Sequence, residues 1–500
     1  MIKKIVDFLR PTQATTCIKD DSEISRLYHV YRLRMIIGIT AGYAFYYTCR
    51  LGLAVTRGPL IESGIATPTQ IGQIGGAIFY GYAFGKLING FIADHVNIRK
   101  LFVGGLLLSV ICNFVFGFSS SIWAFTIAWG LNGWFQGFGP GCCCVAIANW
   151  WEKKERGRYF GIWGASHCIG EGMTYLFTSA IVAWLGWRVG FIAPGILCAL
   201  ASIAIYWLYQ DRPASRGLPP IAEWKPEQDH VELHNASGNS NEMALVSVGR
   251  ENSSTLKEAH TVNVRTVIDD VTKEATPISV NLESSLSIKD RIARQISIFK
   301  SIPIWILCAS SAAMYITRYA IANWGILYLQ EAKGFSVVNA GSLMGINTAA
   351  GVLGGIAYGY FSDKVCNGRR PPATLIWGII QIIGLWGIFL SPFTSYKFIF
   401  GSFIVYGFGI GGLLTVICGL FVAELASKHA SGAATGFVGI FSYLAAAMQE
   451  NISGVLIERN MKIVEGVRHY DFTKPIIFWI SSAVVSLVLV STLWNVKTND

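Results

Sequence analysis

Twelve apolar segments, each about as long as a helix that crosses a lipid bilayer, constrain the fold of this chain more than any other feature. The hydrocarbon core of a bilayer is about 30 Å thick and needs roughly 20 helical residues. Segments of this kind fall near residues 35–56, 70–93, 101–119, 122–149, 159–184, 187–209, 303–329, 336–362, 372–391, 396–424, 431–457 and 475–494. The sequence therefore predicts an all-α membrane protein with two groups of six spans.

The composition agrees with a chain that lies in lipid. Of the 500 residues 52% are hydrophobic and 14% are charged, and the 53 glycines and 16 tryptophans suit close helix packing and membrane interfaces. The net charge of +10 is scattered among the spans, which favours cytoplasmic loops and an anion pathway over a nucleic-acid-binding face. The sequence shows neither a nucleophile–base pair nor a metal or disulfide pattern among its 11 cysteines, so we expect no enzyme activity, no cofactor and no metal site.

Basic residues alternate between the loops as the positive-inside rule requires. The N-terminal segment, "VNIRK", "EKKERGR" and "SDKVCNGRR" fall on one side, whereas the opposite side carries short turns and single charges such as Arg57. The exception is the loop before the last span, with Arg459, Lys462, Arg468 and Lys474. We therefore expect both termini in the cytoplasm. The charged N-terminus shows no cleavable signal or organelle presequence, which favours a bacterial inner membrane over an intracellular eukaryotic one.

The expected organisation has five parts. They are a cytoplasmic segment 1–34, a six-helix bundle 35–210, a cytoplasmic linker 211–300, a second six-helix bundle 301–495 and a cytoplasmic tail 496–500. The linker is polar and its acids and bases nearly cancel, so it is either a disordered spacer or a regulatory segment.

Two arginines occupy equivalent places in the two groups of spans. The segments "GKLINGFIADHVNIRK" (85–100) and "GGIAYGYFSDKVCNGRR" (354–370) share a glycine-rich helix end, an aspartate and a basic cluster. Arg50 precedes Asp94 by 44 positions, and Arg318 precedes Asp363 by 45. Equivalent residues of parallel repeats face each other, so we expect the arginines on opposite walls of a central cavity at mid-membrane.

An arginine within a span needs compensation, because an isolated charge there costs on the order of 3 kcal/mol or more. A guanidinium offers a planar fork of donors that matches phosphate. Two facing guanidiniums repel each other unless an anion lies between them, so the pair predicts a phosphate substrate and obligate exchange. The alternative is that each arginine pairs with an acid or a carbonyl, but no acid lies within one turn on either helix.

Tyrosines accompany both arginines. Tyr43, Tyr46 and Tyr47 share the helix face of Arg50, and Tyr315 lies about one turn before the second arginine. A tyrosine can donate to phosphate and stack on a sugar ring, although it can equally pack helices together. We treat all four as candidate substrate contacts.

Three further ionisable residues lie within spans. Lys86 points either into the cavity or towards a helix end. His167 either packs in an apolar helix or follows the protonation state of phosphate, because histidine titrates near neutral pH. Glu171 would repel an anion unless it pairs with a base or is protonated, and it is also a candidate for proton coupling.

Acidic and basic residues also cluster at the predicted cytoplasmic ends of spans. One cluster holds Asp94 and Arg99, and the other holds Asp363 and Arg369. Aspartate at such a position can cap the next helix and pair with neighbouring bases. We expect these residues to control gating and not to contact substrate.

Together the motifs resemble the major facilitator superfamily and, within it, the organophosphate:phosphate antiporters, which include glycerol-3-phosphate and hexose-6-phosphate transporters. The resemblance covers nearly the whole chain outside the linker and rests on "GYAFYYTCR", "YGYAFGKLINGFIADHVNIRK", "LNGWFQGFGPG", "NWWEKKERGRYFGIWGASHCIG", "DRPASRGLPPI", "MYITRYAIANWGILYL" and "ELASKHASGAATGFVGIFSYL". It implies twelve helices in two six-helix repeats around a central cavity, and exchange of a sugar phosphate for inorganic phosphate by alternating access. It also implies substrate contacts at Arg50, Arg318, His167 and Lys86.

The chain departs from the family pattern at several positions. Leu51 stands where lysine is common, "GPGCCCVA" replaces a stretch with prolines, and Glu171 stands where a small residue is expected. The eleventh span lacks the Asp–Lys pair of hexose-phosphate transporters, for which Gln449 and Glu450 are candidate substitutes. These departures spare the arginine pair but leave the identity of the sugar open.

Two other functions remain open from the sequence. The same family includes membrane sensors that bind a sugar phosphate and signal to a partner kinase, and the long linker and the missing eleventh-span pair favour that hypothesis. A proton-coupled symporter of another anion would need Glu171. For an exchanger we expect a monomer whose partners are the bilayer, a sugar phosphate and inorganic phosphate, without nucleic acid.

Overall fold

The computed structural model describes residues 7–12, 14, 17–224, 298–392, 395–425, 431–464 and 467–496. Most of the predicted linker 211–300 lies outside the described residues, as do residues 497–500 of the predicted tail.

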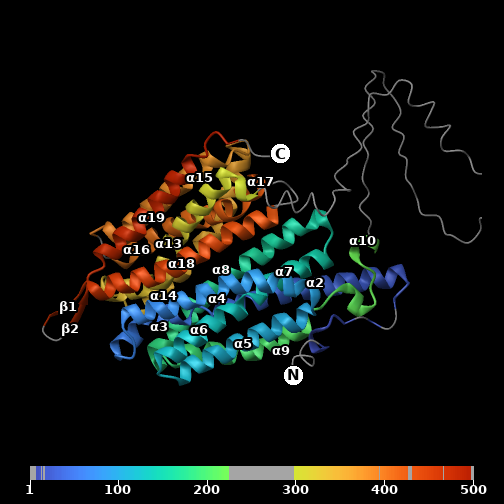
Figure 1. Cartoon of the computed structure of the whole chain (residues 1–500), viewed down its shortest axis with the longest axis horizontal. Coiled ribbons are helices and arrows are strands. Elements are labelled where there is room, and N and C mark those ends of the chain that lie inside the picture. Colours follow the sequence, from blue (N-terminus) through green and yellow to red (C-terminus); the bar gives the residue numbers. More distant parts are fainter. Residues whose placement is uncertain are drawn as a thin grey trace, which may run out of the picture. The chain divides into compact units, whose positions relative to one another are not determined.

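Helices make up nearly all of the described chain, which confirms the predicted fold class (Figure 1). The N-terminal half contains α2 (Asp21–Thr48), α3 (Gly52–Glu62), α4 (Pro68–His95), α5 (Ile98–Phe118), α6 (Ile122–Gln136), α7 (Phe138–Trp150), α8 (Lys153–Leu185) and α9 (Val189–Leu208). After it come the short helices η1 (Pro213–Arg216) and α10 (Ile221–Trp224), and η3 (Ile298–Lys300) precedes the C-terminal half.

The C-terminal half begins with α13 (Ile302–Glu331), α14 (Val337–Lys364) and α15 (Arg370–Leu385). It continues with α16 (Tyr396–Thr415), α17 (Phe421–Leu425), α18 (Ser431–Arg459) and α19 (Thr473–Ser491). The π-helical segments η4 (Trp386–Leu390) and η5 (Val416–Leu420) extend α15 and α16. Between α18 and α19 the antiparallel strands β1 (Met461–Val464) and β2 (Val467–Tyr470) form a hairpin.

Two of the predicted spans are divided by breaks. The first consists of α2 and α3, which are separated at residues 49–51, and the fourth consists of α6 and α7, which meet at Gly137. Nine described helices are each long and apolar enough to cross a membrane. The two divided spans and α4 complete the predicted twelve.

Two pairs of helices make the most extensive contacts between the halves: α4 packs against α18, and α8 packs against α14. Both contacts need glycine, because a side chain on Gly72 of α4 would overlap the carbonyl oxygen of Glu450, and one on Gly341 of α14 would overlap Ser179 of α8. These contacts lie at the helix ends near the loops that connect α3 to α4 and α13 to α14. We call this end of the helices the closed end.

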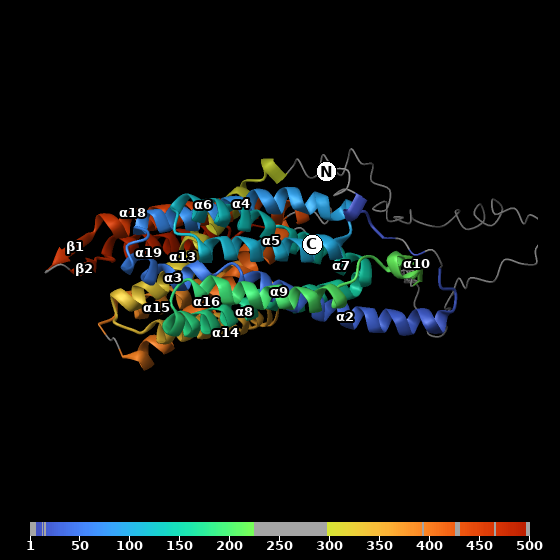
Figure 2. The same ribbon diagram turned by 90° about the horizontal axis from the view of Figure 1, so that it is seen from below.

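At the opposite end the N-terminal half extends beyond its predicted limits of 35 and 210. Helix α2 already begins at Asp21, and residues 211–224 pack on it and on α5 (Figure 2). The carboxylate of Asp211 accepts from the backbone N–H of Ile98 at 3.1 Å, and the Trp224 ring stacks on Tyr28 at 4.7 Å between ring centres. Burial raises the pKa of Asp211. Residues 211–224 therefore belong to the helical body and not to a linker.

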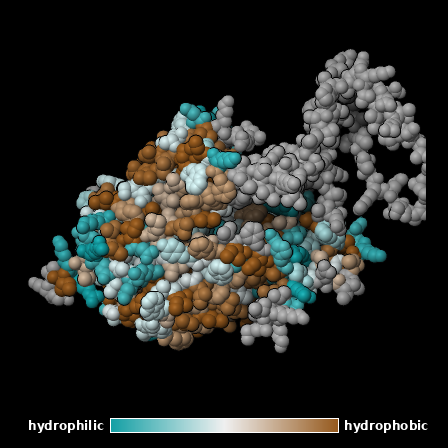
Figure 3. Space-filling model, in the orientation of Figure 1, coloured by the Kyte–Doolittle hydropathy of each residue, from teal (hydrophilic) through white to brown (hydrophobic). Residues whose placement is uncertain are grey.

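Large apolar side chains remain exposed on the outside of the helices, as expected for residues that face lipid. Trp123, Trp184 and Trp207 are 78, 85 and 71% exposed. Apolar residues cover much of the visible face of the helical body, and hydrophilic residues gather towards its two ends (Figure 3). This distribution suits a body embedded in a bilayer.

Substitution of Gly354 by alanine should destabilise the protein by roughly 1–3 kcal/mol, because the added methyl group would overlap the carbonyl oxygen of Phe408 on α16. Gly359 of the same helix has open space at the Cβ position. Alanine should therefore be neutral there, or stabilise by up to about 1 kcal/mol through helix propensity. Thermal unfolding of both variants in detergent tests this packing. Equal stability of the two variants would contradict it.

Candidate functional site

Arg50 lies at the break between α2 and α3, and side-chain amides from neighbouring helices stabilise that break. An interrupted helix leaves carbonyl groups without their intrahelical donors, which is costly within a membrane. Asn113 of α5 and Asn132 of α6 donate to the carbonyl oxygen of Cys49 at 2.8 and 3.0 Å. Gln136 of α6 donates to a carbonyl oxygen of the preceding turn at 2.8 Å. The break is therefore a fixed feature that positions Arg50.

Aromatic rings surround the guanidinium of Arg50. Its Cζ atom lies 4.5 Å from the ring centre of Tyr82, and the corresponding distances to Tyr47, Phe79 and Tyr443 are 5.4, 5.6 and 5.9 Å. Arg50 is 4% exposed, and its Nη2 atom is buried without a hydrogen-bond partner in the described part of the chain. Cation–π contacts contribute about 0.5–2 kcal/mol each, but they leave the N–H donors free for an anion.

Arg318 lies within the continuous helix α13 and has an acidic partner. Its Nη2 atom lies 3.2 Å from Oε1 of Glu171 on α8, and both side chains are 12% exposed. Its Cζ atom is 5.6 Å from the ring centre of Tyr315 and 5.1 Å from that of Tyr319. The sequence analysis found no acid within one turn of this arginine on its own helix, which disfavoured an acidic partner, but the partner comes from another helix, 147 residues away in the chain. The same contact gives Glu171 a basic partner within the helical body.

Tyr443 of α18 connects the surroundings of the two arginines, and the sequence analysis missed it. Its ring centre lies 4.7 Å from that of Tyr82 and 5.5 Å from that of Tyr315. Tyr319 lies 6.4 Å from Tyr443 and 4.5 Å from Phe79. The rings thus form one cluster from both halves. In the sequence, a tyrosine near the middle of the eleventh predicted span was the available signal.

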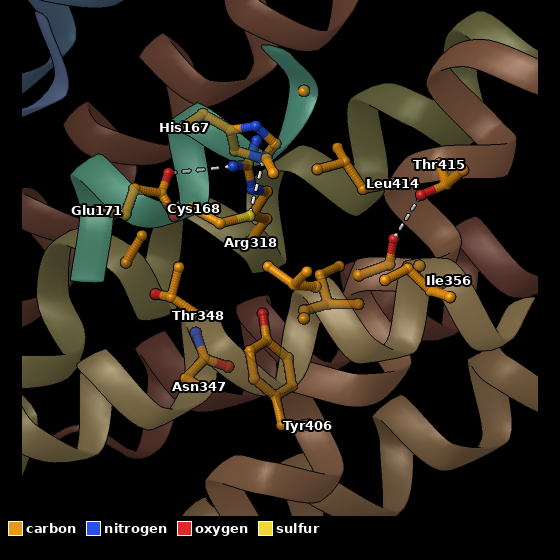
Figure 4. Close-up of a pocket in the computed structure, with 18 of the residues that line it drawn as sticks. His167, Cys168, Glu171, Arg318, Asn347, Thr348, Ile356, Tyr406, Leu414 and Thr415 are labelled. Carbon is orange, nitrogen blue, oxygen red and sulfur yellow. Dashed lines mark hydrogen bonds and ion pairs between the residues drawn. The ribbon is translucent and has the colours of Figure 1, made fainter. Parts of the chain in front are cut away.

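A cavity of about 430 Å³ lies beside Arg318 (Figure 4). Helices α8, α13, α14 and α16 form its wall, whose polar members include His167, Glu171, Arg318, Asn347, Thr348, Tyr406 and Thr415. Arg50 does not line this cavity, because aromatic rings cover it. In this conformation only Arg318 lines the cavity. The structure therefore does not place the two arginines on opposite walls of one cavity, as the sequence predicted.

The other predicted contacts divide into two groups. Tyr43 and Tyr47 lie near the site, with the Tyr43 hydroxyl 3.5 Å from that of Tyr82 and the Tyr47 ring 6.0 Å from that of His167. Tyr46 faces away, because its hydroxyl donates to the carbonyl oxygen of Phe102 at 2.6 Å. It is a packing residue, which corrects the prediction.

Lys86 and His167 both lie at the edge of the aromatic cluster. The Nζ atom of Lys86 is 5.8 Å from the ring centre of Tyr443, and this lysine is exposed. His167 lines the cavity, with Nε2 3.2 Å from the sulfur of Cys168. Both side chains therefore lie beside the rings that surround the two arginines.

The predicted gating clusters are arranged differently from the expectation. Asp363 pairs with Arg370 at 2.6 Å, whereas Arg369 is exposed. Arg370 also donates to the carboxylate of Glu424 at 2.9 and 3.0 Å. Its place in the first turn of α15 directs it between α14 and α17. One position in the sequence therefore decides which arginine is paired.

At the corresponding helix ends of the N-terminal half, the residue that caps α5 and the partner of Arg99 also differ from the prediction. Asn97, and not Asp94, caps α5 by accepting from the backbone N–H of Lys100 at 3.0 Å. The side chain of Asp94 is exposed. Arg99 donates to the carbonyl oxygen of Tyr206 on α9 at 2.6 Å. These contacts hold helix ends of the N-terminal half together.

A buried ion pair joins the halves near the closed end. Arg57, which we expected outside the spans, lies in α3 with 1% exposure, and its Nη2 atom is 2.8 Å from Oε2 of Glu450 on α18. Asn323 of α13 also donates to Glu450, and the Arg57 Cζ atom lies 4.1 Å from the ring centre of Trp324. Glu450, proposed from the sequence to replace part of a missing charge pair, therefore serves as the partner of a buried arginine.

Comparison with known proteins identifies the family. Residues 37–449 match the Major Facilitator Superfamily, which is more than half of the chain. The chain belongs to this superfamily. Solved structures confirm the fold: a bacterial homologue of the human lysosomal transporter Spinster, in an inward-facing and unoccupied conformation, matches with a TM-score of 0.63 at 13% identity over 92% of this chain and 95% of that one. The nucleoside transporter NupG matches with a TM-score of 0.61 at 14% identity, over 92% and 99%.

Relatives at higher identity confirm the resemblance to the organophosphate:phosphate antiporters. The chain is 30% identical to the membrane sensor protein UhpC of Salmonella typhimurium over 89% of each protein. It is 30% identical to a probable hexose phosphate transport protein of Chlamydia pneumoniae over 88% of each, and to the glycerol-3-phosphate transporter of Bacillus subtilis over 95% of each.

Replacement of Glu450 by glutamine should destabilise this facilitator protein by roughly 3–5 kcal/mol, because it leaves Arg57 as a buried charge without a counter-charge. Asp7→Asn is the matched control, because it removes an ion pair to Arg10 whose side chains are 45 and 72% exposed and should cost about 1 kcal/mol or less. Thermal unfolding in detergent measures both variants.

A double variant, Arg57→Leu with Glu450→Leu, separates the ion pair from general packing. It should lose less stability than the sum of the two single leucine variants, since neither charge is left alone. Additive losses would show that the pair is not coupled.

Proposed function

We propose that the chain is a secondary transporter that exchanges an organic phosphate, most simply a hexose phosphate such as glucose 6-phosphate, for inorganic phosphate by alternating access. The observation that carries this proposal is Arg50, a buried guanidinium surrounded by ring faces, with a free N–H donor and no carboxylate on it among the described residues. Such a group lowers its energy when it binds an anion, and phosphate matches its fork of donors. The relatives named as hexose phosphate and glycerol-3-phosphate transporters support this substrate class.

Exchange follows from how the two arginines are compensated. Arg318 already has Glu171 as a counter-charge, whereas Arg50 has none. Crossing of the empty site therefore leaves the charge of Arg50 uncompensated in a low-dielectric interior, and a bound phosphate removes that penalty. A phosphate that reaches Arg318 competes with the Glu171 carboxylate. We infer that release of Glu171 from Arg318 accompanies substrate binding.

The orientation of the protein follows from the basic loops. With these loops in the cytoplasm, both termini are cytoplasmic and the closed end faces outward. We propose a monomer in the inner membrane of a bacterium, as the bacterial relatives support. Alternating access then requires separation of α4 from α18 and of α8 from α14.

A sensor of sugar phosphate is the second candidate, because the relative UhpC is named a membrane sensor protein. Such a protein would use the same phosphate site but would pass the signal to a partner protein instead of completing a transport cycle. Turnover distinguishes the two functions.

Purified protein in liposomes loaded with inorganic phosphate should accumulate labelled glucose 6-phosphate, and uptake should require the internal phosphate. Arg50→Lys should lower the uptake rate by roughly 30-fold or more, since a point charge cannot make the two-pronged contact. Arg26→Lys, at an exposed position of α2, is the matched control and should leave uptake unchanged.

Three outcomes are informative. Uptake without internal phosphate would contradict obligate exchange. Tight binding of glucose 6-phosphate without uptake would favour the sensor. Equal uptake by the Arg50→Lys and Arg26→Lys variants would show that Arg50 does not bind the phosphate.

A further inference from the structure

The wall of the cavity beside Arg318 carries polar groups that have no role in the proposed phosphate site. Tyr406 of α16 is 1% exposed, and its hydroxyl has no hydrogen-bond partner among the residues described. Figure 4 shows this hydroxyl pointing into the cavity, towards the side on which Arg318 and Glu171 lie. A buried hydroxyl without a partner is destabilising, so a ligand that forms a hydrogen bond with it is favoured.

Asn347 of α14 is the second such group. It lines the cavity next to Tyr406, and its Oδ1 atom is buried without a partner in the part of the chain that the structure describes. An amide offers both donors and an acceptor, as a sugar hydroxyl does. Thr348 completes this polar side of the wall.

Glu171 lies across the cavity from this pair. Its Oε1 atom is occupied by Arg318 at 3.2 Å. A carboxylate has about four acceptor positions, so Glu171 can accept from ligand hydroxyl groups while or after it leaves the arginine. Apolar side chains, among them Val352, Ile356, Ile410 and Leu414, line the rest of the wall and suit the C–H face of a sugar ring.

We propose that this cavity is a polyol subsite, in which Tyr406, Asn347 and Glu171 bind the hydroxyl groups of the substrate and so select a hexose phosphate over inorganic phosphate. This inference rests on the proposed phosphate site, since Arg318 joins the two regions. The volume of about 430 Å³ lies within the range of small-molecule sites and leaves room for a pyranose ring. Glu171 thus has a second role, as a hydroxyl acceptor that is also the counter-charge of the empty site.

The test compares how strongly two ligands inhibit phosphate exchange by the same protein. Full-length protein in phosphate-loaded liposomes exchanges labelled inorganic phosphate, and unlabelled glucose 6-phosphate or unlabelled inorganic phosphate competes. Tyr406→Phe should raise the half-inhibitory concentration of glucose 6-phosphate about tenfold, which corresponds to one lost hydrogen bond. The value for inorganic phosphate should change less than about twofold, because inorganic phosphate has no sugar hydroxyl to pair with Tyr406.

The variant should also fold normally, because the Tyr406 hydroxyl makes no hydrogen bond with the described residues of the empty protein. Its melting temperature should be no lower than that of the wild type, because the change removes a buried hydroxyl group without a partner. Asn347→Ala should repeat the selective loss. Tyr360→Phe makes the same chemical change at a position of α14 that is 70% exposed. It should change the half-inhibitory concentration of neither ligand.

An equal change for both ligands, or no change for glucose 6-phosphate in both the Tyr406 and the Asn347 variants, would overturn the subsite while leaving phosphate exchange intact. A wild-type protein that exchanges no phosphate and binds no glucose 6-phosphate would instead overturn the proposed function, and the subsite with it.

Discussion

Compensation of positive charge in a low-dielectric interior is the constraint on which the rest of this structure depends. Arg50, Arg57 and Arg318 meet it in three ways. Arg57 has a carboxylate and an indole ring beside it, and it joins the halves near the closed end. Arg318 has one carboxylate at the wall of a cavity. Arg50 has ring faces only. The degree of compensation therefore decreases from the structural position to the position that we assign to phosphate, which is what an anion-dependent conformational cycle needs.

A rigid frame holds the least compensated charge in place. The break before α3 would be costly in lipid if its carbonyl groups were unpaired, and the amides of Asn113, Asn132 and Gln136 pair with them. Arg318 needs no such support, because α13 is continuous there. The two repeats are thus equivalent in sequence position but unequal in structure, and the site they form is asymmetric. One side offers a free guanidinium, and the other offers a guanidinium and a carboxylate that open onto a polar cavity.

That asymmetry links substrate selection to movement. Glu171 belongs to the N-terminal half and Arg318 to the C-terminal half, so their contact is also a contact between the halves. A ligand that separates them changes the interface along α8 and α14, next to the glycine contact of the closed end. A transporter and a sensor could both use this connection, because each needs ligand binding to alter how the halves meet. They differ in whether the cycle is completed, which depends on the relative energies of the two arrangements.

The sequence by itself determined the membrane fold, the twelve spans and the two arginines, because hydrophobic length and the spacing from Arg50 to Asp94 and from Arg318 to Asp363 are local or repeated patterns. It also singled out Glu171 as anomalous. Only the tertiary structure decided which residues pair with the arginines, that Tyr46 packs against α5 and does not face the candidate site, and that Tyr406 lines a cavity. The physical reason is distance along the chain: every one of these contacts joins different helices. Side chains on one helix have a period that the sequence displays, whereas the rotation of one helix against another is set by packing across the whole body.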